Sequence, residues 1–227
     1  MTTSGRKTKT RVRLDVDERR SQLVELGLAE FGSRPYDEVS IDAIAQAAGI
    51  SKGLVYHYFP TKRAFYIACV REGATRVVNQ IEAPAEGTPF EQLRAAIDRY
   101  LEYVRVHGVA FATLMRSGIG ADREITEIID ETRDALLNLL RSGLGELFPN
   151  VADTKGTLLD IALRGWIGLV ESASIAWVEA CLDQDTKNHT PTADSLRDTL
   201  SEALIAIVAS ALKTQGATST ATSSSHN

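Results

Sequence analysis

Apolar residues recur at offsets of three and four along almost the whole chain, and this helical spacing limits the fold more than any other feature. No run of β-branched residues alternates with polar ones, and no internal repeat is present. Proline and glycine interrupt the spacing at Pro35, Gly49, Pro60, 83–89, 118–120, Pro149 and Pro191. The pattern predicts an all-α fold of about nine helices.

The two segments nearest the C-terminus, about 153–182 and 191–214, are predicted to be its most apolar helices. Small residues that would let another helix approach closely follow one side of the first segment, at Gly165, Gly168, Ser172 and Ala176. Two such helices per chain favour a four-helix contact across the axis of a homodimer. The alternative is that both helices pack inside one subunit.

The termini have a different composition from the rest of the chain. Residues 1–16 form a basic, polar arm, and residues 215–227 are mostly Ser, Thr and Ala, so both are expected to be disordered. Because no membrane span or signal peptide is evident, we expect a cytoplasmic protein. Cys69 and Cys181 lie in apolar, helix-like sequence and are expected to be buried thiols rather than a disulfide.

The charge of the chain is unevenly distributed. The whole sequence has a net charge of −5, but residues 1–75 contain 12 Lys and Arg against 9 Asp and Glu, a net of +3. The remaining residues contain 13 against 21, a net of −8. The positive part is where a polyanion would bind, although many proteins differ this much between halves.

The segment 40–62, SIDAIAQAAGISKGLVYHYFPTK, has the pattern of two short helices joined by a tight turn. Ser40 is a good N-cap for the first helix, and Gly49 supplies the left-handed residue that ends it. A second helix opens at Ser51 and is interrupted at Pro60. Such a pair predicts a helix-turn-helix whose second helix presents side chains and a positive N-terminus to the major groove.

At these residues the chain resembles the TetR family of transcriptional repressors. The family's motif is an apolar helix ending in Phe, then Thr/Ser-x-x-x-Ile-Ala-x-x-Ala-Gly-Val-Ser, then Tyr-x-x-Phe-x-x-Lys. It is met by Phe31, by SIDAIA at 40–45, by AGIS at 48–51 and by YHYFPTK at 56–62. The resemblance is close over residues ~18–72. It implies a helix-turn-helix DNA-binding domain at 17–63 and a helical effector-binding and dimerisation domain at 64–214.

The resemblance also implies which side chains contact double-stranded operator DNA. Phosphates would be bound by Ser40, Tyr58 and Lys62, while the groove would face Ser51, Lys52, Gly53, Tyr56 and His57. Outside this motif, Tyr56 would be interpreted as an aromatic residue of the core and Lys52 as a solvated surface charge. The basic residues of the arm would enter a minor groove or serve only for solubility.

Three departures from the family pattern affect local structure. Pro35 stands where the family usually has Gly, so this corner must turn without a left-handed residue. Gly27 replaces a usual Ala inside the first helix, at a cost of about 1 kcal/mol unless close packing offsets it. Leu54 takes the place of a frequent Thr and lacks the hydroxyl group with which that Thr could bond a base or a phosphate.

A small, largely hydrophobic effector is expected in the second domain. Aromatic and apolar residues at helical spacing are candidates to line its cavity, although such a stripe is also typical of plain core: Tyr100, Tyr103, His107, Phe111 and Met115. Arg164 and Glu171 are seven apart and share a helix face, where they would pair with each other, face a dimer partner or meet the ligand.

Other classes of function find little support. Motifs of hydrolases, nucleotide-binding enzymes and zinc proteases are absent, so no catalytic residue is predicted. The four histidines lack the spacing of metal ligands, and no cofactor or metal is expected. A helical sensor that binds no DNA is the alternative within binding proteins. The sequence does not distinguish a repressor from an activator.

Overall fold

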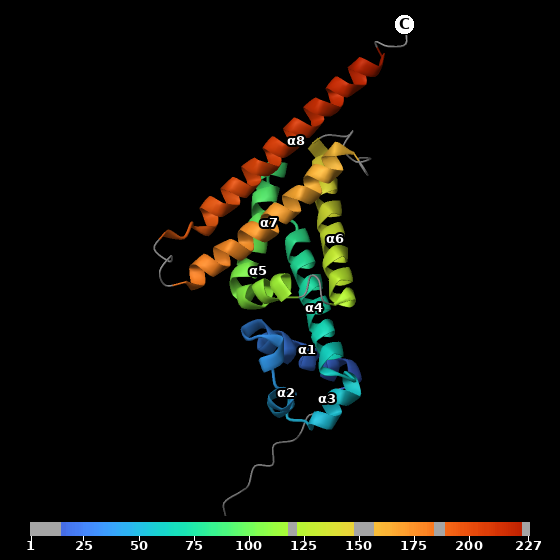
Figure 1. Ribbon diagram of the computed structural model, residues 1–227, viewed down its shortest axis with the longest axis vertical. Coiled ribbons are helices and arrows are strands. Elements are labelled where there is room, and N and C mark those ends of the chain that lie inside the picture. Colours follow the sequence, from blue (N-terminus) through green and yellow to red (C-terminus); the bar gives the residue numbers. More distant parts are fainter. Residues whose placement is uncertain (1–14, 118–121, 148–156, 184–188, 224–227) are drawn as a thin grey trace, which may run out of the picture.

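The computed structural model describes residues 15–117, 122–147, 157–183 and 189–223. No strand occurs in these ranges, which confirms the all-α prediction, and a single 3₁₀ turn, η1 (Tyr36–Glu38), follows the first helix. The helices are α1 (Val16–Ser33), α2 (Ile41–Ala47), α3 (Lys52–Tyr58), α4 (Lys62–Glu82), α5 (Pro89–Ser117), α6 (Arg123–Leu147), α7 (Leu158–Leu182) and α8 (Ala193–Ser223). Helices α1–α3 lie at one end of the molecule, and α4 leads from them into a bundle with α5–α8 (Figure 1).

The helices of the small N-terminal domain begin at polar caps, of which Ser40 was predicted from the sequence. Asp15 and Glu18 form a capping box on α1, in which each carboxylate accepts the backbone N–H of the other residue at 2.8 and 3.0 Å. A core of its own joins α1, α2 and α3 to the start of α4, with buried side chains from Leu23, Val24, Phe31, Val39, Ile41, Ile44, Ala45, Ala48, Val55, Phe59, Phe65 and Cys69.

Helices α1 and α4 are in close contact at Gly27. A Cβ added there would lie 2.5 Å from the Sγ of Cys69 and 2.7 Å from the Cζ of Phe65. Both distances are shorter than side-chain atoms tolerate, so no larger residue fits without a shift. The absence of a side chain at Gly27 therefore permits a close packing of α1 and α4, the condition under which its cost in helix propensity is offset.

The two corners of the N-terminal domain turn differently. After α1 ends at Ser33 the chain is extended at Arg34, and Pro35 then opens η1 with a φ of −56°. In the described chain, positive φ values occur only at glycines, and one of them is Gly49, with a φ of 66°, between α2 and α3. The first corner thus turns without a left-handed residue, and the second uses the predicted glycine.

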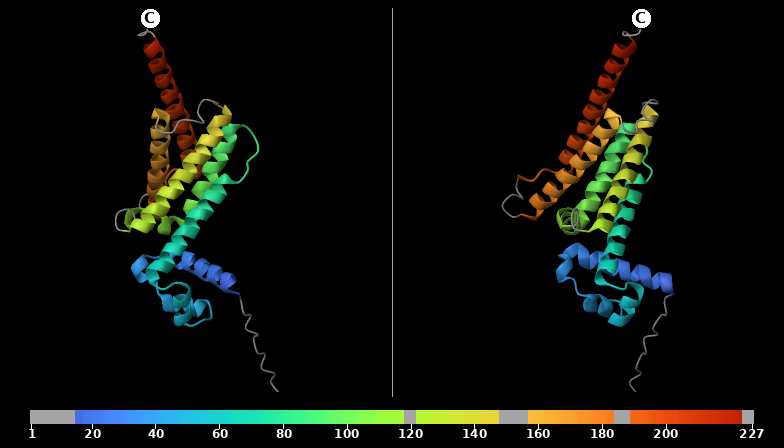
Figure 2. Two further views of the ribbon diagram at one scale, coloured as in Figure 1. Left: turned by 90° about the vertical axis from the view of Figure 1, so that its right-hand side faces the viewer. Right: turned by 45° about the vertical axis from the view of Figure 1, so that its right-hand side comes forward.

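Helix α4 belongs to two cores. Its first half places Phe65 and Cys69 in the core of the N-terminal domain, and its second half places Val77 in the core of the bundle. The views in Figure 2 show α4 running from the α1–α3 end up along α6. A displacement of α4 within the bundle would therefore be carried to the helix-turn-helix through continuous packed structure.

Helix α5 bends at His107, which has a φ of −109° and a ψ of 17° inside the helix. Gly108, next in the chain, lies against Val178 of α7, because a Cβ there would be 2.4 Å from a methyl carbon of that valine. The described chain has eight α-helices, close to the predicted number; the bend divides α5 into two straight parts.

Both tryptophans of α7 join it to the α8 segment. The indole N–H of Trp166 donates to the carbonyl of Leu200 at 3.0 Å, and that of Trp177 donates to the carbonyl of Pro191 at 2.9 Å. These bonds satisfy the polar edge of each buried ring. By length and composition α7 could cross a membrane, but its tryptophan face is buried in the bundle, as the core helix of a helical protein would be.

Two expectations about the C-terminal part need correction. Helix α8 continues to Ser223, so the predicted disordered tail does not begin at residue 215; after Pro191 no proline stops the helix. Cys69 is buried, and burial raises its pKa to about 12, whereas Cys181 is exposed near the end of α7. The prediction of two buried thiols is wrong for Cys181, whose apolar neighbour Leu182 is also exposed.

Candidate DNA-binding surface and ligand cavity

The recognition helix α3 is held by its caps and by one buried face. Ser51 is its N-cap and accepts the backbone N–H of Leu54 at 3.2 Å. Val55 is only 1% exposed, and Phe59, directly after the helix, is 3% exposed. A helix of seven residues is unstable alone, so these contacts fix it on the domain and leave its opposite face free.

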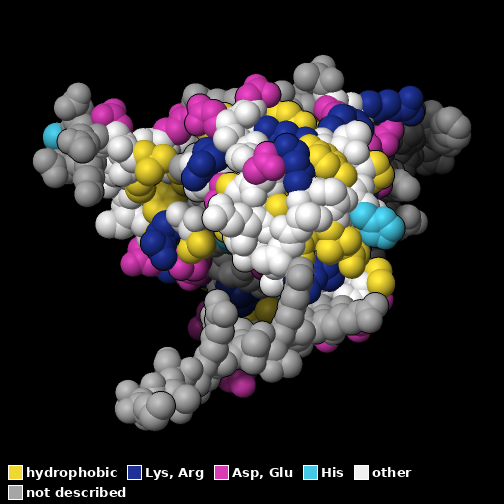
Figure 3. All heavy atoms as spheres, turned by 90° about the horizontal axis from the view of Figure 1, so that it is seen from below, with side chains coloured by type: hydrophobic (Ala, Val, Ile, Leu, Met, Phe, Trp, Pro, Cys, Tyr) yellow, Lys and Arg dark blue, Asp and Glu magenta, His cyan; other side chains and the backbone are white. Residues whose placement is uncertain are grey.

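The residues predicted to contact DNA lie on this free face and beside it. Ser40, Ser51, Lys52, Gly53 and His57 are exposed, while Tyr56, Tyr58 and Lys62 are partly buried. Ser40 is also the N-cap of α2 and accepts the backbone N–H of Ala43 at 3.3 Å. Seen from this end of the molecule, the basic side chains of the described residues lie among acidic and apolar ones (Figure 3).

Two of the predicted DNA-contacting lysines have partners within the protein. The Nζ of Lys52 lies 2.7 Å from a carboxylate oxygen of Asp42 on α2. The Nζ of Lys62 donates to the carbonyl of Asp37 at 3.2 Å and lies 4.7 Å from the centre of the Tyr36 ring. Each ammonium group has further N–H donors, so a contact with DNA is still available to both. Neither partner was predicted from the sequence.

The N-terminus of α6 is attached to α4 close to the recognition helix. The Arg63 guanidinium donates to both carboxylate oxygens of Asp122 at 2.6 and 2.7 Å, and it also reaches Glu124 at 3.3 Å. This guanidinium holds the pKa of Asp122 below its usual range. Ile67 of α4 also belongs to a buried apolar cluster with Ile125, Ile128 and Ile129 of α6. These contacts connect the bundle to the residue that follows Lys62 in the chain.

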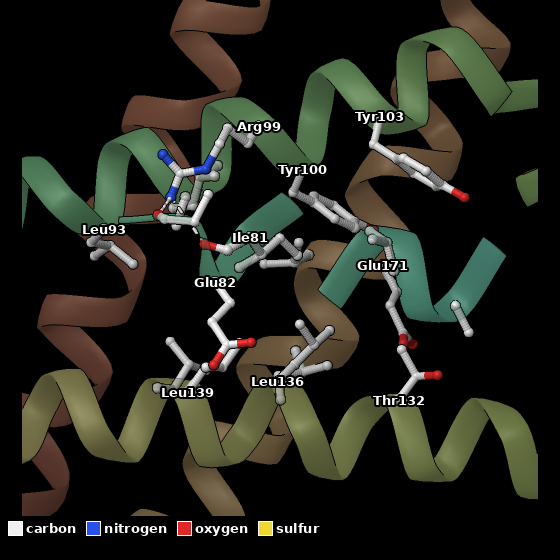
Figure 4. Close-up of a pocket in the computed structure, with 18 of the residues that line it drawn as sticks. Ile81, Glu82, Leu93, Arg99, Tyr100, Tyr103, Thr132, Leu136, Leu139 and Glu171 are labelled. Atoms are coloured by element: carbon white, nitrogen blue, oxygen red, sulfur yellow. Dashed lines mark hydrogen bonds between the residues drawn. The ribbon is translucent and has the colours of Figure 1, made fainter. Parts of the chain in front are cut away.

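A cavity of about 880 Å³ lies within the helices of the bundle and reaches the N-terminal domain. Its wall is mainly apolar and comes from α1, α4, α5, α6, α7 and α8. Figure 4 shows part of it, with side chains of α4 and α5 facing those of α6. The size and apolar lining are typical of a site for a small organic molecule.

Four of the residues predicted to line a cavity do so: Tyr100, Tyr103, His107 and Glu171. Phe111 and Met115 lie outside the described side chains. Arg164 does not line the cavity; its guanidinium is half-exposed and donates to Asp134 of α6 at 2.9 Å. Arg164 and Glu171 therefore do not pair with each other.

Two charged groups of the cavity wall, Glu171 and Arg99, are hydrogen-bonded to other parts of the protein. Glu171 accepts two hydrogen bonds from the Nε and Nη2 of Arg133, at 3.0 and 2.8 Å, and its carboxylate lies toward Thr132 (Figure 4). Arg99 donates to the carbonyls of Gln80, at 2.8 Å, and Ile81, at 2.9 Å, at the end of α4. A ligand would therefore be held mostly by apolar contact.

Among the titratable side chains of the cavity wall, His107 has the ordinary pKa that lies nearest to neutral pH. Its ring lies against that of Tyr103, with 4.5 Å between the ring centres. Burial, together with the positive charge of Arg76, lowers the pKa of His107 below its usual value. The imidazole is therefore neutral at neutral pH and has both a donor and an acceptor nitrogen.

Much of the cavity wall was not predicted, above all the part from α6. This helix contributes Ile128, Ile129, Leu136, Leu139, Leu140 and Leu144. Their spacing is that of an ordinary core stripe, and only the position of α6 opposite α4 and α5 makes them a wall. No group of His, Cys, Asp and Glu side chains suited to a metal occurs among the described residues.

Two family profiles match the sequence. A profile described as bacterial regulatory proteins of the tetR family covers residues 23–69, and one described as a tetracyclin repressor-like C-terminal domain covers residues 89–207. The first spans the helix-turn-helix, and the second spans most of the helices around the cavity. Together they include both functional regions found in the structure.

Solved structures and curated proteins agree with the profiles. A tetR-family transcriptional regulator from Streptomyces coelicolor is 32% identical, with a TM-score of 0.74, covering 87% of this chain and 83% of that one. The transcriptional activator FasR of Mycolicibacterium smegmatis is 31% identical over 94 residues, 40% of this chain and 43% of its own. The FadR of Bacillus subtilis, solved in complex with stearoyl-CoA, has the same fold at 19% identity, with a TM-score of 0.62, covering 81% and 96% of the two chains. The chain spans about half the length of the first curated relatives that it matches.

Proposed function

Because the chain belongs to the TetR family of bacterial regulatory proteins, we propose that it is a sequence-specific transcriptional regulator. It binds a palindromic operator as a homodimer, and a small, largely hydrophobic ligand in the cavity releases it. The observation that supports this most is the free face of α3, where Lys52, Gly53 and His57 are exposed beside the partly buried Tyr56.

The residues of this face suit the two kinds of contact that operator binding needs. Lys52 can donate to the O6 and N7 of guanine, and Gly53 lets the backbone come close to DNA. The Tyr56 ring can reach a thymine methyl group, and His57 can donate to a phosphate. Ser40, Tyr58 and Lys62 lie at the ends of the helix-turn-helix, where the phosphate backbone would pass.

The ligand is proposed to be elongated and mainly apolar. A cavity of about 880 Å³ has room for a molecule larger than a simple aromatic acid, and two of the charged groups on its wall, Arg99 and Glu171, are occupied by protein partners. The same fold in the FadR of Bacillus subtilis accompanies stearoyl-CoA, which makes long-chain compounds the first candidates to test.

The homodimer is proposed to form through the outer faces of α7 and α8, at 153–182 and 191–214 as the sequence suggested. The row of small residues on α7 is exposed, and a Cβ added at Gly165 or Gly168 would meet no atom of a neighbouring element within 4 Å. Large apolar side chains are exposed beside it, including Ile161, Leu169 and Ile205. Such a face is typical of surfaces that associate in water, and two copies would bury it.

Ligand binding would reach the DNA through α6 and α4. Helix α6 lines the cavity with its middle and C-terminal part, and its N-terminus is attached to Arg63 at the start of α4. A ligand that moves α6 would thus change the position of α3 relative to its counterpart in the dimer. Since both recognition helices must enter successive grooves, a modest change lowers operator affinity.

A repressor is the simpler form of this proposal, because release by a ligand then switches transcription on. An activator would use the same fold and contacts, and the activator FasR is among the relatives. The mixed charge of the α1–α3 end would also suit a sensor that binds no DNA, and the experiment below distinguishes such a sensor from a DNA-binding regulator.

We place the action of the protein in the cytoplasm, where its operator DNA would be.

The test is selection of duplexes from a random library by the full-length protein, compared with a variant that carries Lys52→Ala and Tyr56→Ala. We expect enrichment of a palindrome by the wild type and its loss in the variant. If the wild type binds only weakly, without sequence preference and with strong salt sensitivity, the protein is not a sequence-specific regulator.

A further inference from the structure

The acidic residue Asp42 lies on the surface that would face DNA, and it makes a specific contact there. Its carboxylate belongs to the first turn of α2 and lies 2.7 Å from the Nζ of Lys52, the first residue of α3. The two side chains are 67% and 49% exposed, so solvent and a bound duplex can both reach them. The contact joins the two helices of the helix-turn-helix.

Helix electrostatics explain only part of this arrangement. A negative charge in the first turn of α2 is favourable, whereas the positive charge of Lys52 at the N-terminus of α3 is unfavourable and gains from a nearby carboxylate. Neither effect helps binding to a polyanion. A carboxylate beside phosphates is repelled, and it cancels one of the few positive charges on the exposed face of α3.

We propose that Asp42 determines specificity by holding Lys52 at the entrance of the major groove while neutralising its charge toward phosphates. Of the three N–H groups of the ammonium, one is given to Asp42 and two remain, enough for the O6 and N7 of one guanine. A Lys52 that is free of Asp42 would instead bind any nearby phosphate. Asp42 therefore weakens sequence-blind binding more than it weakens operator binding. The inference rests on the proposed function, because it requires an operator.

The first test compares Asp42→Asn with a matched control, Glu38→Gln. Glu38 is exposed in η1, close before α2, and no ion pair of this residue is present in the described chain. Both variants remove one negative charge near the DNA-binding surface, but only Asp42→Asn frees Lys52. Operator and scrambled duplexes are titrated with each protein at several salt concentrations, and melting temperatures confirm that both variants fold.

We expect Asp42→Asn to raise affinity for the scrambled duplex by roughly two- to fivefold per subunit, the range of an exposed ion pair, and to leave operator affinity equal or lower. The slope of log affinity against log salt for the scrambled duplex should steepen by about 0.9 per freed lysine. The ratio of the two affinities, which is the specificity, should therefore fall. Glu38→Gln should change both affinities by the same small factor.

The second test places Asp42→Asn in a Lys52→Ala background. If Asp42 acts through Lys52, its substitution has no further effect on the affinity ratio there. The inference is wrong if Asp42→Asn changes the ratio equally with and without Lys52, or if it behaves as Glu38→Gln does. A wild type that enriches no palindrome refutes the proposed function itself, and the inference with it; a wild-type palindrome with an unchanged ratio refutes only the role of Asp42.

Discussion

Replacing Gly27 by alanine should destabilise the protein, although alanine is the better helix former. The helix propensity of α1 would improve by about 1 kcal/mol. Against this, the new Cβ would lie 2.5 Å from the Sγ of Cys69 and 2.7 Å from the Cζ of Phe65. Forcing an extra methyl group into such a core costs about 1–3 kcal/mol.

The neighbours have little freedom to move away from the new methyl group. Phe65 is fully buried and in ring contact with Phe31 and Phe59, with 5.9 and 4.7 Å between the ring centres. The overpacking cost should therefore exceed the gain in propensity, for a net loss of about 0–2 kcal/mol. The melting temperature should fall by up to several degrees, since about 2–4 °C corresponds to 1 kcal/mol in a chain of this size.

Thermal unfolding, followed by circular dichroism, measures this effect, and a second substitution checks its cause. Cys69→Ala removes the sulfur atom that Gly27→Ala would meet, so the double variant should lose less stability than the sum of the two single variants. A rise of melting temperature in Gly27→Ala would refute the reasoning, because it would show that α1 and α4 are not packed as closely as described.

Three further predictions concern the bundle. Asp160→Ala leaves the mostly buried guanidinium of Arg141 without its carboxylate partner, and chemical denaturation should show a loss of about 3 kcal/mol. His107 has a folded pKa below its usual value of 6.5, so the unfolded chain takes up its proton first and stability should fall as the pH drops below about 6.5; His107→Gln should remove that part of the pH dependence, and an unchanged profile would contradict it. Ala96→Trp, on the cavity wall, should abolish binding of an elongated apolar probe such as stearoyl-CoA and leave operator affinity unchanged; Ala95→Trp, whose site is outside the wall, should preserve both, and equal effects of the two would contradict the placement of the cavity.

Local structure could be predicted from the sequence where the cause is local. Ser40 and Ser51 are N-caps because a short hydroxyl side chain satisfies the first N–H groups of a helix. Gly49 ends α2 because the turn to α3 needs a residue with a left-handed backbone. The bend of α5 at His107 was missed, because no proline or glycine pair marks it; its position coincides with the close contact between Gly108 and Val178.

The candidate sites were predictable to different degrees. On the predicted DNA-binding surface the motif puts Lys52 at the start of α3, where the structure has it exposed, but its partner Asp42 lies ten residues away on another helix, and nothing in the local pattern indicates the contact. In the bundle, helical spacing predicted that Glu171 and Arg164 share one face of α7. In the structure each is instead bonded to a residue of α6, Glu171 to Arg133 and Arg164 to Asp134. Which of these two charges reaches the cavity depends on how α6 and α7 pack, and that is a long-range property.

The central claim, that this protein recognises a DNA sequence through α3, is tested most directly by titrating the selected palindrome and a scrambled duplex at several salt concentrations. The account predicts that the wild type binds the palindrome far more tightly, by at least about 10³-fold, and that the variant with Lys52→Ala and Tyr56→Ala loses most of that difference. Equal affinity of the wild type for both duplexes, or a preference that survives in the variant, would contradict it.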